Sequence, residues 1–146
     1  MAESVNHLPT STQAPLSTDD GVSAGLGADT QTEFELHFFA GILRRHPSNL
    51  DVIRAHSRNL AQLGMHLETL EIDRRWVRLT PNDPLAHYNL ARTYALTSQF
   101  EQALDSLRNA IECGYRDFQS IRQENDLRDL RDDPRFAELL FEYGDL

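Results

Sequence analysis

Residues 85–112 read LAHYNLARTYALTSQFEQALDSLRNAIE, and this stretch decides the fold. Apolar side chains recur at helical spacing on both sides of a break at Thr97–Gln99, which predicts two helices joined by a tight turn. So short a connection makes the two helices antiparallel neighbours. Ala91 and Ala103 fall where these helices approach most closely, so only a small side chain fits at either position.

A 34-residue period extends this hairpin along the chain. Pro47 and Pro81 lie 34 residues apart, each close behind a helical pattern that ends with arginine and a large residue. This period, together with the order of small and large side chains, resembles the tetratricopeptide repeat (TPR) family. The matching positions are Leu90, Ala91, Tyr94, Phe100, Ala103, Leu107 and Ala110. The resemblance implies an all-α fold in which antiparallel helical hairpins stack as a short right-handed solenoid.

Residues 83–115 match the repeat pattern most clearly, and we call them the clear repeat. The other segments are assigned relative to it. DFQSIRQENDLRDLRDDPRFAELL, residues 117–140, resembles a capping segment often appended to bacterial TPR domains. The expected organisation of the domain 32–146 is a partial repeat at 33–48, a degenerate repeat at 49–82, the clear repeat and a C-terminal cap at 116–146. The predicted helices are 33–46, 49–63, 66–79, 85–96 and 100–113, a short helix after Asp117, and a last helix that Asp133 caps and Pro134 begins.

Helix ends are predicted from capping residues. Thr32, Ser48 and Ser98 are each followed three residues later by Glu or Asp, so we expect them to cap helix N-termini. Gly64 and Gly114 follow helical patterns, and we expect both to end helices in the left-handed conformation.

Residues 1–31 differ from the rest of the chain in composition. They are rich in Ser, Thr, Gly, Pro and Ala and contain few large apolar residues. Such a segment buries too little apolar surface to offset the entropy of ordering, so we expect a disordered acidic tail. Residues 1–33 contain five acidic and no basic residues, whereas the remaining 18 acids are accompanied by 14 arginines.

Residue types exclude several kinds of chemistry. Lysine is absent, and the single cysteine, Cys113, cannot form an internal disulfide or a cysteine-based metal site. The six histidines form no pair four residues apart, and no HExxH motif occurs. We expect the acids of 124–133 to pair with neighbouring Arg128 and Arg131 on a solvated surface. The sequence therefore predicts no catalytic residue, no metal, no cofactor and no enzymatic activity.

Charge and hydropathy limit the partners. The net charge of −9 argues against nucleic-acid binding, which requires excess positive charge. Apolar runs are too short to cross a membrane, and the N-terminus lacks the basic flank and apolar core of a secretory signal. We expect a cytoplasmic location and another protein or peptide as the partner.

The TPR resemblance implies a binding groove, because the first helix of each TPR hairpin lines the concave face. The groove residues that it implies are Arg54, Arg58, Leu85, Tyr88, Asn89, Arg92, Leu96 and Arg122. Arginine binds carboxylates through two parallel hydrogen bonds, so we predict an interaction module or adaptor whose groove binds an acidic segment. Asn89 also matches an asparagine of the clamp by which some TPR domains hold the acidic C-terminus of heat-shock chaperones.

Three alternatives remain open at this point. The arginines could simply pair with neighbouring acids on a solvated surface. The protein could be a regulatory or assembly subunit of a larger enzyme complex. It could also be a self-associating scaffold, with a homodimer formed through helix 33–46, whose Phe34, Phe38 and Phe39 offer an aromatic surface.

Overall fold

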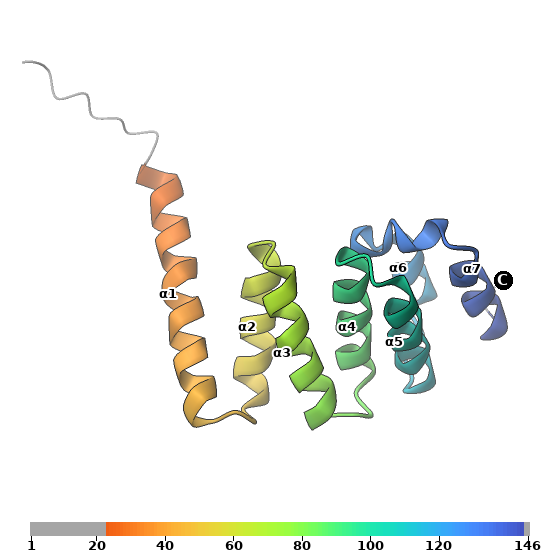
Figure 1. Cartoon of the computed structure of the whole chain (residues 1–146), viewed down its shortest axis with the longest axis horizontal. Coiled ribbons are helices and arrows are strands. Elements are labelled where there is room, and N and C mark those ends of the chain that lie inside the picture. The colour runs from red at the N-terminus through yellow and green to blue at the C-terminus, as the bar shows by residue number, and fades with distance from the viewer. Residues whose placement is uncertain (1–22, 145–146) are drawn as a thin grey trace, which may run out of the picture.

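The computed structural model describes residues 23–144, which form α-helices and two short 3₁₀ helices joined by short turns. The α-helices stand side by side in one row, with α1 at one end and α7 at the other (Figure 1). The predicted all-α fold of stacked antiparallel hairpins is confirmed. In chain order the elements are α1 Ser23–Arg45, α2 Leu50–Gln62, α3 His66–Leu79, α4 Pro84–Leu96, α5 Phe100–Glu112, α6 Phe118–Gln123, η1 Asn125–Leu127, η2 Leu130–Asp132 and α7 Pro134–Glu142.

Glycine and proline set most of these boundaries. Gly64 and Gly114 follow α2 and α5 with φ angles of +70° and +117°, a backbone conformation that side chains with a Cβ rarely adopt. Pro84 and Pro134 occupy the first turns of α4 and α7, where the missing N–H costs no helical hydrogen bond. Asp133 caps α7 as predicted, since its carboxylate accepts a hydrogen bond from the Arg135 N–H.

Three predicted N-caps are wrong, and two of them concern α2 and α5. Asn49, not Ser48, caps α2, with its side-chain oxygen accepting a hydrogen bond from the Val52 N–H. Ser98 adopts a left-handed conformation with φ +59°, and its N–H closes the end of α4 by donating to the Ala95 carbonyl. It therefore belongs to the turn, and α5 begins after Gln99 without a side-chain cap.

The first helix is longer than expected. It begins at Ser23, so Thr32 lies inside α1 and does not cap it. No proline interrupts the segment between residue 23 and Thr32, and the Gln31 side chain donates to the Glu35 carboxylate one turn later. The predicted disordered tail, 1–31, thus overlaps the first turns of α1 at 23–31. Its remaining part, 1–22, lies outside the described residues.

The larger apolar core joins the clear hairpin to the C-terminal segment. Ala91 and Ala103 are fully buried where α4 meets α5, as their small size predicted. Leu127, Leu130 and Phe136 from η1, η2 and α7 pack into the same cluster. The C-terminal segment thus covers apolar surface that the last hairpin would otherwise expose to water.

A smaller core lies at the other half of the row. Its buried members are Leu43, Ile53, Trp76 and Ala86, which come from α1, α2, α3 and α4. Trp76 occupies a position where the repeat pattern predicts a small residue. The large indole fills the space between successive hairpins, and it also lines the cavity described next.

Candidate functional site

A cavity of about 500 Å³ opens between α2 and α4, with residues of α3 and η1 completing its wall. Its lining residues are Arg54, Ser57, Arg58, Ala61, Gln62, His66, Trp76, Leu85, Asn89, Arg92, Thr93, Leu96 and Asp126. This set includes six of the eight groove residues expected from sequence: Arg54, Arg58, Leu85, Asn89, Arg92 and Leu96.

The other two expected residues lie outside the cavity lining. Tyr88 is only 4% exposed, and its ring stacks on Tyr115 with ring centres 4.3 Å apart, so it belongs to the core. Burial raises the pKa of the Tyr88 hydroxyl above its ordinary value. Arg122 is an exposed residue of α6 that does not reach the lining. Helical spacing alone could not distinguish the buried face of α4 from the face that lines the cavity.

A buried carboxylate supports the polar part of the cavity wall. Asp73 of α3 is 1% exposed and accepts hydrogen bonds from the Ser57 hydroxyl at 2.6 Å and the Thr93 hydroxyl at 2.7 Å. These contacts join α2, α3 and α4. Burial raises the pKa of Asp73, while the two hydroxyl groups and the positive charge of Arg92 act in the opposite direction.

Arg54 packs on the aromatic part of the wall. Its guanidinium carbon lies 5.4 Å from the centre of the Trp76 ring, within the range of a cation–π contact. Its closest carboxylates are those of Asp83 at 3.7 Å and the exposed Asp51 at 4.0 Å. Both distances are long for an ion pair, so Arg54 retains most of its capacity to bind an anion.

Arg92, in contrast, is held by the C-terminal segment. Its guanidinium donates to the Asp126 carboxylate at 2.7 and 3.1 Å and lies 3.5 Å from the Glu124 carboxylate. It also donates to the Asn89 side-chain oxygen at 3.1 Å. The expectation that the acids of 124–133 pair with Arg128 and Arg131 is therefore wrong for these two carboxylates, although Arg128 does lie 3.8 Å from Asp129.

Arg58 occupies the remaining position on the α2 wall. It is exposed, and within residues 23–144 the structure records no carboxylate in ion-pair contact with it. Arg54 lies one helical turn away on the same side of α2, so two guanidinium groups line this wall. The cavity therefore has a cationic wall on α2 and, next to η1, an end where carboxylates surround Arg92.

Between residues 23 and 144, no three His, Cys, Asp or Glu residues gather closely enough to hold a metal ion. None of the helices in that range is both long and apolar enough to cross a bilayer.

The comparisons identify the repeat. Residues 74–105 match the family model of the tetratricopeptide repeat, and this match covers all of α4 and the turn behind it. Residues 74–105 therefore contain a tetratricopeptide repeat. The hairpins of the chain form the short right-handed TPR solenoid that the resemblance implied.

Solved structures agree with the TPR fold. MamA from Desulfovibrio magneticus RS-1 has a TM-score of 0.55 and 16% sequence identity over 82% of this chain and 72% of that one. A double mutant described as MamA RS-1 ArsTM gives the same score and identity, covering 71% of its chain. At this identity the similarity concerns the fold alone.

One curated protein shares a stretch of sequence. A chloroplastic protein from Arabidopsis thaliana is 36% identical over 67 residues. That stretch makes up 45% of this chain but only 20% of the relative, so most of the relative has no counterpart in the match.

Proposed function

We propose that this TPR protein is a non-enzymatic interaction module that binds an acidic segment of a partner protein in the cavity between α2 and α4. The observation that carries the proposal is the α2 wall, where Arg54 and Arg58 line the cavity and Arg58 has no carboxylate partner among the described residues. The TPR match supports a protein-binding role in general. The arginines specify the chemistry of the segment, because a guanidinium binds carboxylates in a defined geometry.

The remaining lining suits a peptide. Binding sites for small ligands and side chains combine apolar walls with a few polar groups, and their volumes range from about 300 to 1,000 Å³. Here Trp76, Leu85 and Leu96 supply apolar surface, while Asn89 and the arginines supply polar groups. An extended segment can therefore place an apolar side chain in the cavity and a carboxylate on the α2 wall.

The buried acid near the cavity fits binding better than catalysis. Asp73 has a raised pKa, which in other proteins often accompanies catalytic acids. However, both of its carboxylate oxygens already accept hydrogen bonds, from Ser57 and Thr93, and its side chain is almost completely buried. We therefore assign Asp73 to positioning the helices around the cavity.

Partner capture with matched variants tests this function. The full chain serves as bait in a lysate of the source cells, and the captured partner is then titrated against purified protein. Arg54→Ala with Arg58→Ala should weaken binding at least about tenfold, which corresponds to 1.4 kcal/mol. The control is Arg44→Ala with Arg45→Ala, which removes the same charge from the exposed last turn of α1, outside the cavity lining.

Salt dependence separates a local contact from general charge attraction. Screening weakens exposed ion pairs, so wild-type binding should fall as the salt concentration rises. The Arg54/Arg58 variant should show a smaller fall because the ionic contact is already lost. Equal binding by this variant and the Arg44/Arg45 control would contradict the proposed site.

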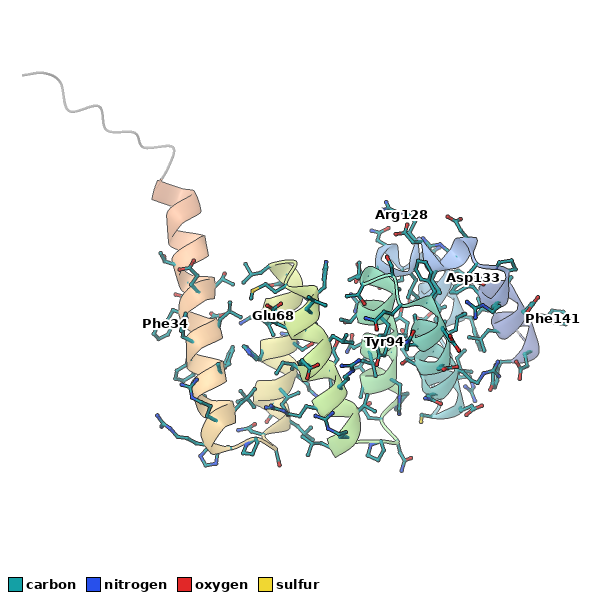
Figure 2. The ribbon with its side chains drawn as sticks, in the orientation of Figure 1. Phe34, Glu68, Tyr94, Arg128, Asp133 and Phe141 are labelled. Carbon is teal, nitrogen blue, oxygen red and sulfur yellow. The ribbon has the colours of Figure 1, made fainter. Side chains whose placement is uncertain are left out.

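A second candidate role, self-association, rests on α1. Phe34 and Phe38 are 64% and 52% exposed, and their rings stack with centres 6.0 Å apart. Phe34 points away from the row of helices at its α1 end (Figure 2). A second copy could cover this aromatic surface, which would make the protein a scaffold or an assembly subunit of a larger complex.

A further inference from the structure

We propose that the cavity is electrically polarised, so that it binds a segment carrying a carboxylate at one end and a cationic group at the other. The carboxylate lies on the α2 wall, the cationic group lies beside Asp126, and an apolar side chain of the segment packs on the apolar residues of the lining. This inference rests on the proposed function and specifies the chemistry of its ligand. It replaces the uniformly positive groove that the arginines alone would suggest.

The cationic end is defined by α2. Arg58 has no ion-pair partner in residues 23–144, and Arg54 meets its nearest carboxylates only at 3.7 and 4.0 Å. A carboxylate from a ligand can therefore approach these two guanidinium groups without displacing a short ion pair. The Trp76 ring beneath Arg54 restricts the position of that guanidinium, which lowers the entropy cost of binding.

The anionic end is defined by η1 and its neighbour Glu124. Two carboxylates, those of Asp126 and Glu124, lie within 3.5 Å of the single Arg92 guanidinium, so this group of three carries a net negative charge. Asp126 lines the cavity, and its side chain is 30% exposed. A ligand carboxylate placed here would meet like charge, whereas a ligand ammonium or guanidinium group would be attracted.

Apolar side chains also line the cavity. Trp76, Leu85 and Leu96 line the cavity, and Leu85 and Leu96 are among the exposed large apolar residues. These side chains can pack against one apolar residue of the ligand. The opposite charges of the α2 wall and of the Asp126 end fix which end of the segment faces α2.

Three synthetic peptides test the polarity with the protein's own fluorescence. Trp76 is the only tryptophan of the chain and lines the cavity, so its emission reports ligand entry. The probes are the acetylated and amidated peptides Asp-Asp-Leu-Leu-Lys-Lys, Asp-Asp-Leu-Leu-Asp-Asp and Lys-Lys-Leu-Leu-Lys-Lys, titrated to millimolar concentration at low salt. The mixed peptide should bind at least about threefold more tightly than either other peptide, the scale of one partly exposed ion pair.

Two variants link this preference to particular residues. Arg58→Ala should weaken binding of the mixed peptide and of the all-acidic peptide. Asp126→Asn should shift the preference toward the all-acidic peptide, whereas Asp129→Asn, an exposed acid outside the cavity lining, should leave it unchanged. If Asp126→Asn proves unfolded by circular dichroism, Glu124→Gln removes the second carboxylate at Arg92 and should shift the preference in the same direction.

The outcomes separate the two proposals. Preference of the wild-type protein for the all-acidic peptide would overturn the polarity but agree with the proposed acidic ligand. Failure of all three peptides to change the Trp76 emission would overturn both. Preference for the mixed peptide that survives Arg58→Ala and both acid-to-amide variants would also overturn the polarity, because the charges named here would not cause it.

Discussion

Arg92 of α4 and Asp126 of η1 form an ion pair at 2.7 Å between residues that are 34 positions, one repeat length, apart. The pair fastens the C-terminal segment to the clear TPR hairpin and closes one end of the cavity. The side chain of Arg92 is 33% exposed and that of Asp126 is 30% exposed, so water screens the pair only in part. Arg92 is thus a structural residue as well as a lining residue.

Replacing Arg92 should lower stability. Charge-assisted hydrogen bonds contribute about 1.5–3 kcal/mol when shielded and less when exposed, so Arg92→Ala should lower the free energy of unfolding by about 1–2 kcal/mol. Arg58→Ala is the control. Because Arg58 is exposed and makes no such contact with the described residues, its replacement should change the free energy of unfolding by less than about 0.5 kcal/mol. Urea denaturation followed by circular dichroism measures both. Equal stability of the two variants would show that the pair with Asp126 does not hold the cap.

The fold could be predicted from local signals in the sequence. Pro84, Gly64 and Gly114 mark helix ends through backbone conformations that are specific to these residue types, and α3 has the bounds expected for it. The predicted start of α1, residue 33, is wrong because composition alone does not stop a helix when no proline intervenes. Ser98 was misjudged because a capping pattern does not reveal that the residue adopts a positive φ.

The candidate site could be predicted less completely. Arg54 and Arg58 could be placed together because they lie four residues apart on one helix. Asp126 was missed because its partner Arg92 lies on a different helix, and no local pattern reports a contact across a repeat. Such a contact could be sought by comparing residues one repeat length apart, since 34 positions separate these two.

Enlarging Ala103 should destabilise the clear hairpin. Ala103 is fully buried between α4 and α5, and adding atoms to a packed core costs about 1–3 kcal/mol. Ala103→Leu should therefore lower the midpoint of urea denaturation. Gln102→Leu adds the same leucine at the neighbouring, exposed position and should change the midpoint little. A midpoint close to that of the wild type for Ala103→Leu would mean that these helices can separate without cost.

Asp73 should make stability depend on pH. Burial raises its pKa in the folded state above the ordinary value of 3.8, so the folded protein holds this proton more tightly than the unfolded chain. The stabilisation is complete below about pH 4 and declines as the pH rises toward the folded-state pKa, by at most about 1.4 kcal/mol per pH unit.

Comparison with Asp73→Asn isolates this contribution. Asparagine does not titrate, so the difference in free energy of unfolding between wild type and variant should favour the wild type most at about pH 4 and decrease toward pH 7. Urea denaturation at several pH values measures this difference. A difference that grows with pH would mean that the hydrogen bonds from Ser57 and Thr93 outweigh burial and lower the pKa of Asp73.

The aromatic surface of α1 should mediate self-association. The terminal helices of a repeat array usually present a polar outer face, yet Phe34 and Phe38 are largely exposed there. Full burial of one such side chain contributes about 1.5–3 kcal/mol, and a symmetric pair of α1 helices would bury both residues from each copy. Phe34→Ser with Phe38→Ser should therefore shift sedimentation equilibrium toward monomer.

Phe141→Ser is the matched control, because Phe141 is 69% exposed on α7 at the opposite end of the row (Figure 2). A wild-type protein that remains monomeric at every concentration would contradict the scaffold role. An equal shift in the Phe141→Ser control would show that exposed aromatic rings associate nonspecifically.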